Sequence, residues 1–153
     1  MTRNRPVLFG LASIVAGVGA ANVFTGTQSP TPVMIVYKSP TCGCCTAWVD
    51  HIKQAGFRVV VHDTVDVQPI KDRWGVPAAL GSCHTARVGR YVIEGHVPAS
   101  DIQRMLKEKP AFAGLAAPGM PMSSPGMDAG GPHQAYDVVS FEKQGKTAIY
   151  AQH

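Results

Sequence analysis

One stretch of the sequence decides the fold: Val33-Met-Ile-Val-Tyr-Lys-Ser-Pro-Thr-Cys-Gly-Cys-Cys45. Its first five residues, 33–37, are apolar and β-branched, which is typical of a buried strand. A turn follows, in which Thr41 or Cys42 stands where a helix would be capped. An apolar stripe at helical spacing then runs from residue 44 to about residue 55. The stretch therefore predicts a strand, a tight turn that carries cysteines, and a helix.

The elements that follow predict the fold class. A second strand over residues 57–62 completes a βαβ unit, whose crossover should be right-handed. Beyond it we expect a short helix, two strands joined by a tight turn and a further helix, over residues 67–74, 82–88, 91–94 and 100–109. The resulting order, β-α-β-α-β-β-α, is that of the thioredoxin fold. We therefore predict an α/β protein with a thioredoxin-like fold, in which Val76-Pro77 lies where such proteins carry a cis-proline.

The C-terminal part changes in composition. Residues 111–132 are rich in Met, Pro and Gly and carry almost no charge, so we expect an extended loop there. Residues 136–150 predict a terminal β-hairpin. The loop and the hairpin belong to one domain over residues 33–153, which follows a polar linker over residues 25–32.

The N-terminus predicts export. Arg3 and Arg5 precede an uncharged apolar run from Val7 to Phe24, and small residues at 18–21 suit a signal peptidase. The run is also just long enough to span a bilayer. Residues 1–24 are therefore a signal peptide or an N-terminal anchor, and we expect a periplasmic protein that meets the membrane only if the leader is not cleaved.

The overall charge excludes several functions. The chain has 153 residues, with 14 basic against 10 acidic side chains, and Arg3 and Arg5 account for two of the basic ones. Since no basic patch is interleaved with aromatic residues, we expect no nucleic-acid partner. The sequence also has no glycine-rich phosphate loop and no Gly-x-Ser-x-Gly nucleophile motif.

Four cysteines are the candidate functional residues. Cys42, Cys44 and Cys45 open the predicted helix, where unpaired N–H groups and the helix dipole favour thiolates. Cys83 lies near the start of the third strand. In a thioredoxin-like sheet this strand runs antiparallel beside the first strand, so its start lies next to the end of the first strand, where the cysteine-bearing turn is. We therefore expect the four sulfurs to converge. His84 should point to the opposite face of the sheet.

The spacing of these cysteines favours copper. Adjacent Cys44 and Cys45 chelate one tetrahedral ion poorly, but they suit thiolates that bridge several ions. Cu(I) accepts thiolate and low coordination numbers, so a multinuclear Cu(I) cluster fits best, with zinc as the alternative metal. Two further readings remain: dithiol redox chemistry without metal, with Cys42 as nucleophile and Cys45 as resolving thiol, and structural disulfide pairing.

Methionine and histidine residues offer secondary ligands. Met120, Met122 and Met127 lie in the predicted loop, and thioethers bind Cu(I). They could equally fill gaps in packing. His96, just before a helix, and His84, next to Cys83, are the candidate imidazole ligands.

Several motifs resemble the CopG-like copper-resistance proteins, small exported bacterial proteins that were formerly a domain of unknown function. The matching strings begin at Ser39-Pro-Thr-Cys-Gly-Cys-Cys45 with Trp48 and continue, in the same order, with Gly75-Val-Pro77, Ser82-Cys-His-Thr-Ala86, Tyr91-Val-Ile-Glu-Gly-His-Val-Pro-Ala99, Gly114-Leu-Ala-Ala-Pro-Gly-Met-Pro121 and Ser124-Pro-Gly-Met127. The resemblance covers nearly everything from Val33 to the end.

The resemblance implies a thioredoxin-like fold with a cysteine-bridged copper cluster and a role in copper resistance, by copper redox interconversion. By position, Cys42, Cys44, Cys45 and Cys83 would be the cluster cysteines, and Met120 and Met127 match the family loop. Met122 and Ser123 stand where the family has Val and Gly. The expected partners are copper ions and periplasmic copper-handling proteins. The residues leave open whether the chain is an enzyme, either a copper oxidoreductase or a thiol-disulfide oxidoreductase.

Overall fold

The computed structural model describes residues 32–128 and 130–153. The predicted leader, residues 1–24, and residues 25–31 of the predicted linker lie outside the described residues. None of the helices in the described ranges combines the length and the apolar character needed to cross a membrane.

The described chain forms three α-helices, one 3₁₀ turn and seven strands. In chain order they are β1 (Met34–Lys38), α1 (Gly43–Gln54), β2 (Val59–Asp63), α2 (Gln68–Trp74), η1 (Ala78–Leu80), β3 (His84–Val88), β4 (Tyr91–Gly95), α3 (Ala99–Glu108), β5 (Gly114–Ala117), β6 (Asp137–Phe141) and β7 (Thr147–Gln152). The predicted order β-α-β-α-β-β-α is confirmed up to α3, and the predicted terminal hairpin is β6 and β7.

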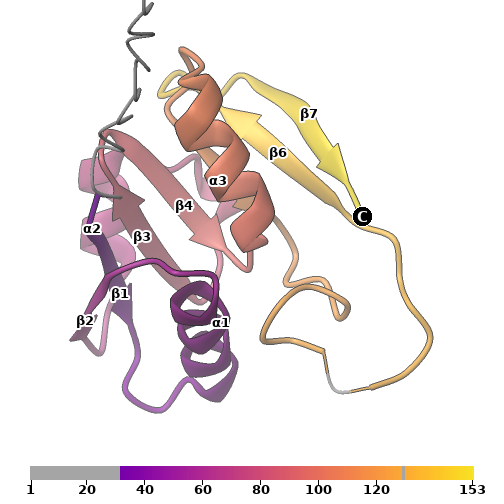
Figure 1. The fold of residues 1–153 in the computed structure, drawn as a ribbon. Coiled ribbons are helices and arrows are strands. Elements are labelled where there is room, and N and C mark those ends of the chain that lie inside the picture. Colours follow the sequence, from indigo (N-terminus) through magenta and orange to yellow (C-terminus); the bar gives the residue numbers. More distant parts are fainter. Residues whose placement is uncertain (1–31, 129) are drawn as a thin grey trace, which may run out of the picture.

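A single mixed sheet organises the molecule, which confirms the α/β class. The strand order is β2-β1-β3-β4-β5-β6-β7. β1 pairs with β2 in parallel and with β3 antiparallel, as the βαβ unit requires. β4 and β5 are also parallel, and the remaining neighbours are antiparallel. Figure 1 shows α1 and α3 packed on the same face of the sheet, with α2 at the far side.

Two apolar cores hold the helices on the sheet. The larger core lies under α1 and α3, where Trp48, Ile52, Ile102 and Met105 are fully buried. The smaller core lies on the other face and includes Phe141, with Trp74 of α2 packed against it. Both faces of the central strands are therefore covered, which is why every residue of β4 is buried.

The turn between β1 and α1 forms as predicted. Cys42 is the N-cap of α1, and its sulfur accepts a hydrogen bond from the backbone N–H of Cys45 at 3.4 Å. A sulfur therefore replaces the usual capping oxygen. The cap fixes Cys42 at the end of β1 and places two further cysteines in the first turn of the helix.

Two sequence predictions are wrong. Residues 114–117 were expected in a loop, but they form β5, because this small apolar segment completes the sheet beside β4 and is fully buried. Pro77 was expected to follow a cis bond, but residues 32–128 and 130–153 contain no cis peptide bond. The 3₁₀ turn η1 separates Pro77 from β3, so Pro77 does not directly precede the strand.

Candidate metal centre

Four sulfur atoms meet at one end of the sheet. Three come from the N-terminus of α1, and the fourth, that of Cys83, comes from the residue just before β3. β3 is antiparallel to β1, so its start lies beside the end of β1, where α1 begins. One ligand atom from each of Cys42, Cys44, Cys45 and Cys83 lies within 4.8 Å of the others. The predicted convergence is confirmed, and metal ligation by these residues stays a prediction.

The sulfurs form two contacting pairs joined by a disulfide. Cys42 and Cys45 are disulfide-bonded, whereas Cys44 and Cys83 are free thiols. The Cys44 Sγ lies 3.5 Å from that of Cys42, and the Cys83 Sγ lies 3.3 Å from that of Cys45. Cys42 thus contacts Cys44 and is bonded to Cys45, and Cys45 in turn contacts Cys83, so the four sulfurs form one continuous chain.

A buried ion pair holds the backbone next to Cys83. The Lys71 ammonium group, on α2, contacts both the Glu94 carboxylate and the carbonyl of Ser82. The same carboxylate oxygen of Glu94 accepts a hydrogen bond from the N–H of Ser82 at 2.6 Å. Burial raises the pKa of Glu94, and the attraction of Lys71 opposes that shift. The N–H and the carbonyl of Ser82 are thus both hydrogen-bonded, which fixes the backbone next to Cys83 and so the position from which its side chain extends.

His96 lies against Cys83 in an orientation suited to a ligand. Its Nε2 is 3.3 Å from the Cys83 sulfur, and its Nδ1–H donates to the carbonyl of Pro125 at 2.8 Å. That bond leaves the lone pair on Nε2, the atom that faces the sulfur. Burial lowers the pKa of His96, which favours the neutral ring that can donate to a metal.

His84 also lies near Cys83, so the prediction that it points away is wrong. Its Nδ1 is 3.5 Å from the Cys83 sulfur. β3 begins only at His84, so the alternation of a strand does not extend back to residue 83. Burial lowers the pKa of His84 well below its usual value, with further lowering by His96 and Lys71. Its Nε2 is buried and has no hydrogen-bond partner.

The free thiol of Cys83 is kept protonated by its surroundings. Burial raises its pKa, and a hydrogen bond from Ser82 opposes the shift. A metal that binds here must therefore displace a proton, as thiolate ligation generally requires. Cys83, His84 and His96 form a second group of donors whose ligand atoms lie within 4.8 Å of one another, and this group shares Cys83 with the four-cysteine group.

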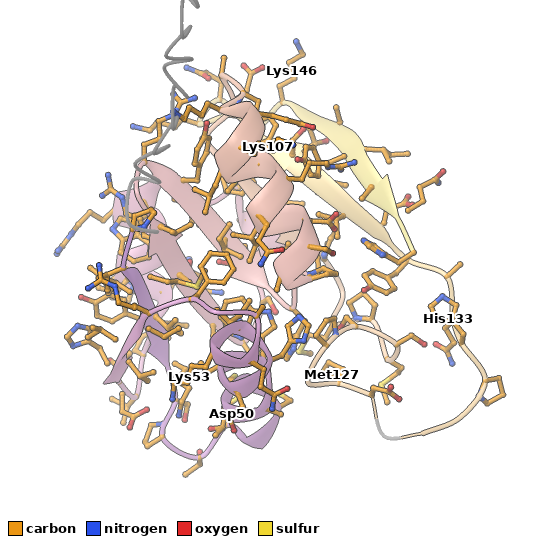
Figure 2. All side chains as sticks on the ribbon, viewed as in Figure 1. Asp50, Lys53, Lys107, Met127, His133 and Lys146 are labelled. Atoms are coloured by element: carbon orange, nitrogen blue, oxygen red, sulfur yellow. A yellow bond between two sulfur atoms is a disulfide. The ribbon has the colours of Figure 1, made fainter. Side chains whose placement is uncertain are left out.

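The loop between β5 and β6 contains Met120, Met122 and Met127, and we call it the Met-bearing loop. It covers part of the cysteine-bearing N-terminus of α1. A Cβ added to Gly126 would lie 2.8 Å from the carbonyl oxygen of Cys44, so the loop backbone touches the first turn of α1. Met127 follows at once and is half-buried beside α1 (Figure 2). Met120 and Met122 are 43% and 49% exposed. The loop thus meets the helix start through residues 125–127, whereas Met120 and Met122 face solvent to a large extent.

Sequence reasoning missed the buried polar groups around the site. Lys71 and Glu94 were not singled out, although a glutamate inside the apolar strand Tyr91-Val-Ile-Glu94 signals a carboxylate in need of a partner. His51 was not singled out either, although its Nε2 accepts a hydrogen bond from the N–H of Ala99 at 3.1 Å and joins α1 to α3.

Fold and site together define a small α/β protein with a cysteine cluster able to bind metal. A family described as "Protein of unknown function, DUF411" matches residues 80–127. Two solved structures, called copper resistance protein CopG in forms 1 and 2, match at 40% and 39% identity. Each match covers 80% of this chain and 98% of that chain, with a TM-score of 0.75. A search of curated proteins finds no match.

The chain belongs to the CopG-like family of copper-resistance proteins. This confirms the family resemblance found in the motifs. The family membership and the cysteine cluster together support a copper-related role.

Proposed function

We propose that this chain is a periplasmic copper-binding protein that holds Cu(I) in a cysteine-bridged multinuclear cluster and contributes to copper resistance. The observation that carries the proposal is the convergence of four sulfurs within 4.8 Å from two separate chain segments. Four thiolates that serve several ions must bridge, and the continuous chain of sulfur contacts from Cys44 through Cys42 and Cys45 to Cys83 supports bridging.

The donor set favours Cu(I) over zinc. Thiolate and neutral imidazole are the donors around Cys83, and the described ligand groups contain no carboxylate. Cu(I) accepts two or three such ligands, whereas a structural zinc ion requires four around a single centre. His96 is the strongest additional ligand, because its tautomer directs a lone pair at the cluster. His84, Met127 and the more exposed Met120 and Met122 are secondary candidates.

The redox state of one cysteine pair would control how much copper is held. In the disulfide form only Cys44 and Cys83 remain as thiols. In the dithiol form all four sulfurs can ligate. Oxidation of Cys42 and Cys45 to the disulfide releases two electrons and two protons, and two Cu(II) ions take one electron each to become Cu(I). A dithiol reductant then restores the pair. This stoichiometry gives copper redox interconversion a direct chemical route.

X-ray absorption of the fully reduced, Cu(I)-loaded protein tests the cluster. We expect sulfur ligands and short copper–copper distances, which mononuclear sites lack. Cys44→Ser should remove the copper–copper signal, while Ser82→Ala, which keeps all four sulfurs, should retain it. A spectrum with sulfur ligands but no neighbouring copper in the wild type would contradict the cluster.

A second function is favoured by the Cys42–Cys45 disulfide itself. A pair spaced Cys-x-x-Cys at a helix N-terminus is the arrangement of thiol-disulfide oxidoreductases. In that case the metal-free protein should reduce insulin disulfides, Cys42→Ala should abolish the activity, and Cys83→Ala should leave it intact. Under the copper proposal Cys83→Ala instead removes copper binding.

A further inference from the structure

A second functional feature lies at the opposite end of β3 from Cys83. Beside the turn between β3 and β4, the surface forms a hollow of about 600 Å³. We call it the basic hollow, and its lining includes Trp74 and the charged residues Arg73, Arg87, Arg90, Glu142 and Lys143. The four basic residues come from α2, from β3, from the β3–β4 turn and from the β6–β7 turn. Segments far apart in the sequence therefore bring cations to one place.

The Lys and Arg side chains at this end of β3 lack the carboxylate partners that other Lys and Arg side chains of the described residues have. Of the twelve Lys and Arg residues in the described ranges, five form an ion pair with a carboxylate within 4.0 Å. Six of the other seven line the basic hollow or the apolar hollow next to it, where Lys107 and Lys109 lie. The seventh is Arg58. None of these six cations has a carboxylate oxygen within 4.0 Å among the described residues.

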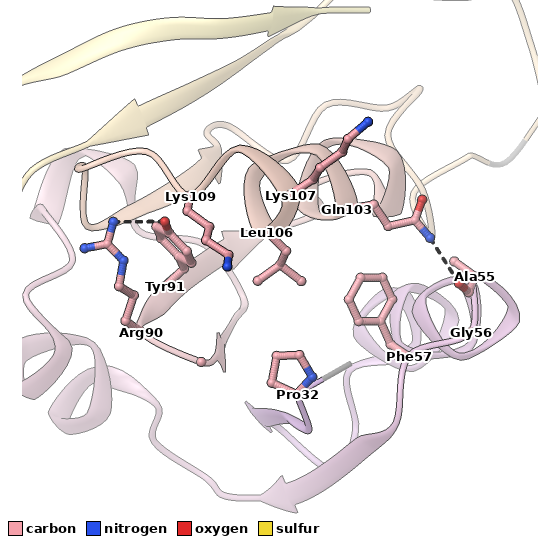
Figure 3. Close-up of a pocket in the computed structure, with 11 residues that line it drawn as sticks. Pro32, Ala55, Gly56, Phe57, Arg90, Tyr91, Gln103, Leu106, Lys107 and Lys109 are labelled. Atoms are coloured by element: carbon pink, nitrogen blue, oxygen red, sulfur yellow. Dashed lines mark hydrogen bonds between the residues drawn. The ribbon is translucent and has the colours of Figure 1, made fainter. Parts of the chain in front are cut away.

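Two of the hollow's side chains are held in place. The Arg90 guanidinium donates to the hydroxyl of Tyr91 at 2.9 Å, as Figure 3 shows in its view of the neighbouring apolar hollow. It also donates to the carbonyl of Pro110 and lies over the Tyr91 ring. The stem of Lys143 crosses Gly75, where an added Cβ would lie 3.3 Å from the Lys143 Cγ. Fixed side chains lose less conformational freedom when they bind a ligand.

The only carboxylate in the lining does not neutralise the hollow. Glu142 has its Oε1 3.8 Å from Lys146, a residue outside the lining. The lining holds four cations against one carboxylate, and a concave surface with such an excess of one sign focuses the electric field and concentrates oppositely charged ligands. Arginine forks match phosphate oxygens in paired hydrogen bonds. The volume is also larger than one phosphate group needs and suits a small-molecule ligand.

We propose that the basic hollow binds a phosphate-bearing anion with two or more negative charges. The ligand would contact cations from more than one of these chain segments and lie beside Trp74. Copper plays no part in this site, because the hollow and Cys83 lie at opposite ends of β3.

Calorimetric titration of the full chain with inorganic pyrophosphate tests the proposal. Arg87→Gln and Lys143→Gln should each weaken binding by about tenfold, the loss expected for one charge-assisted hydrogen bond. Arg58→Gln removes the same charge from outside the hollow and should change binding by less than about twofold. Raising the ionic strength from about 0.05 M to about 0.5 M should weaken binding to the wild type.

A vesicle arm distinguishes a free ligand from a lipid headgroup. Binding to vesicles of cardiolipin, whose headgroup carries two phosphates, and phosphatidylcholine is compared with binding to phosphatidylcholine alone, so that insertion of the apolar leader cancels. If only the anionic vesicles bind, with the same loss in Arg87→Gln and Lys143→Gln, the phosphate belongs to a lipid. Binding of polyglutamate alone, binding of no probe, or an equal loss in Arg58→Gln overturns the proposal. Copper content should be unchanged in all three variants, so this result is independent of the copper proposal.

Discussion

The two ends of β3 treat polar groups in opposite ways. Where the strand begins, Lys71, Glu94, His84 and His96 are buried. Lys71 Nζ, Glu94 Oε1 and His96 Nδ1 each have a specific partner, whereas His84 Nε2 and Glu94 Oε2 have none. Where it ends, Arg87 and Arg90 are exposed, and no carboxylate pairs with them among the described residues. If one polar side chain at the buried end is removed, its partner is left without a hydrogen bond and out of reach of water. At the exposed end, the remaining side chains can still hydrogen-bond to water. The polar groups at the start of β3 are therefore held in a fixed geometry, whereas the cations at its end remain free to attract an anion.

The largest expected difference concerns two Lys–Glu pairs. Glu94→Leu leaves the buried Lys71 ammonium without its carboxylate and Ser82 without an acceptor, so we expect a loss of about 3–5 kcal/mol in the free energy of unfolding. Glu142→Leu breaks the exposed pair with Lys146 and should cost less than about 1 kcal/mol. Urea denaturation of both variants provides the measurement.

A double variant separates charge from packing at the same place. Lys71→Met combined with Glu94→Leu removes both buried charges, so much of the loss seen in Glu94→Leu should be recovered. Equal losses in Glu94→Leu and Glu142→Leu would remove the distinction between the two ends.

A smaller effect is expected from two glycines of the Met-bearing loop. Gly126 and Gly119 both have positive φ angles, 85° and 75°. A Cβ on Gly126 would lie 2.6 Å from the N atom of Trp48, whereas Gly119 has nothing within 4 Å. Gly126→Ala should therefore cost about 2 kcal/mol more than Gly119→Ala in urea denaturation. Similar losses in the two variants would mean that the loop does not press on α1.

His96 offers a test through metal affinity. His96→Phe keeps a planar aromatic ring but removes the nitrogen that faces Cys83, so we expect Cu(I) affinity to fall about tenfold. His62→Phe, on an exposed ring stacked against Tyr37, should leave it unchanged. Competition with a chromophoric Cu(I) chelator measures both. An unchanged affinity in His96→Phe would exclude this histidine from the site.

The smallest expected effect is a pH dependence at His51. Burial lowers the pKa of His51, and its neutral Nε2 accepts from the N–H of Ala99. Since the folded-state pKa lies below the unfolded one, the stabilisation is fully present above pH about 6.5 and is lost as the pH falls through the folded-state value. His51→Gln keeps an acceptor that does not titrate, so its stability should fall less between pH 7 and pH 5. Parallel thermal-unfolding profiles for the two proteins would contradict this assignment.

Local signals in the sequence predict much of this fold. The apolar run of β1, the capping position of Cys42 and the helical stripe of α1 each depend on a few neighbouring residues, and all were predicted. β5 escaped prediction because Gly114-Leu-Ala-Ala117 carries no strong strand propensity and becomes a strand only through its pairing with β4 and β6.

The candidate site also has one part that the sequence predicts and another part that it does not. The convergence of Cys83 with the helix cysteines follows from the order of the strands, so topology alone predicts it. The position of His84 depends on where β3 starts, and the partners of Glu94 and His96 come from α2 and from the distant loop at Pro125. No pattern within a single segment contains that information. The basic hollow escaped prediction for the same reason, since its four cations are scattered from residue 73 to residue 143.

Copper stoichiometry under anaerobic conditions tests the central claim most directly. The fully reduced wild-type chain is loaded with Cu(I), freed of loosely bound metal by a competing chelator, and analysed for copper beside a variant with all four cysteines changed to Ser. We predict more than one tightly bound copper per wild-type chain and none in the variant. One copper or fewer in the wild type, or equal copper in the two proteins, would contradict the account.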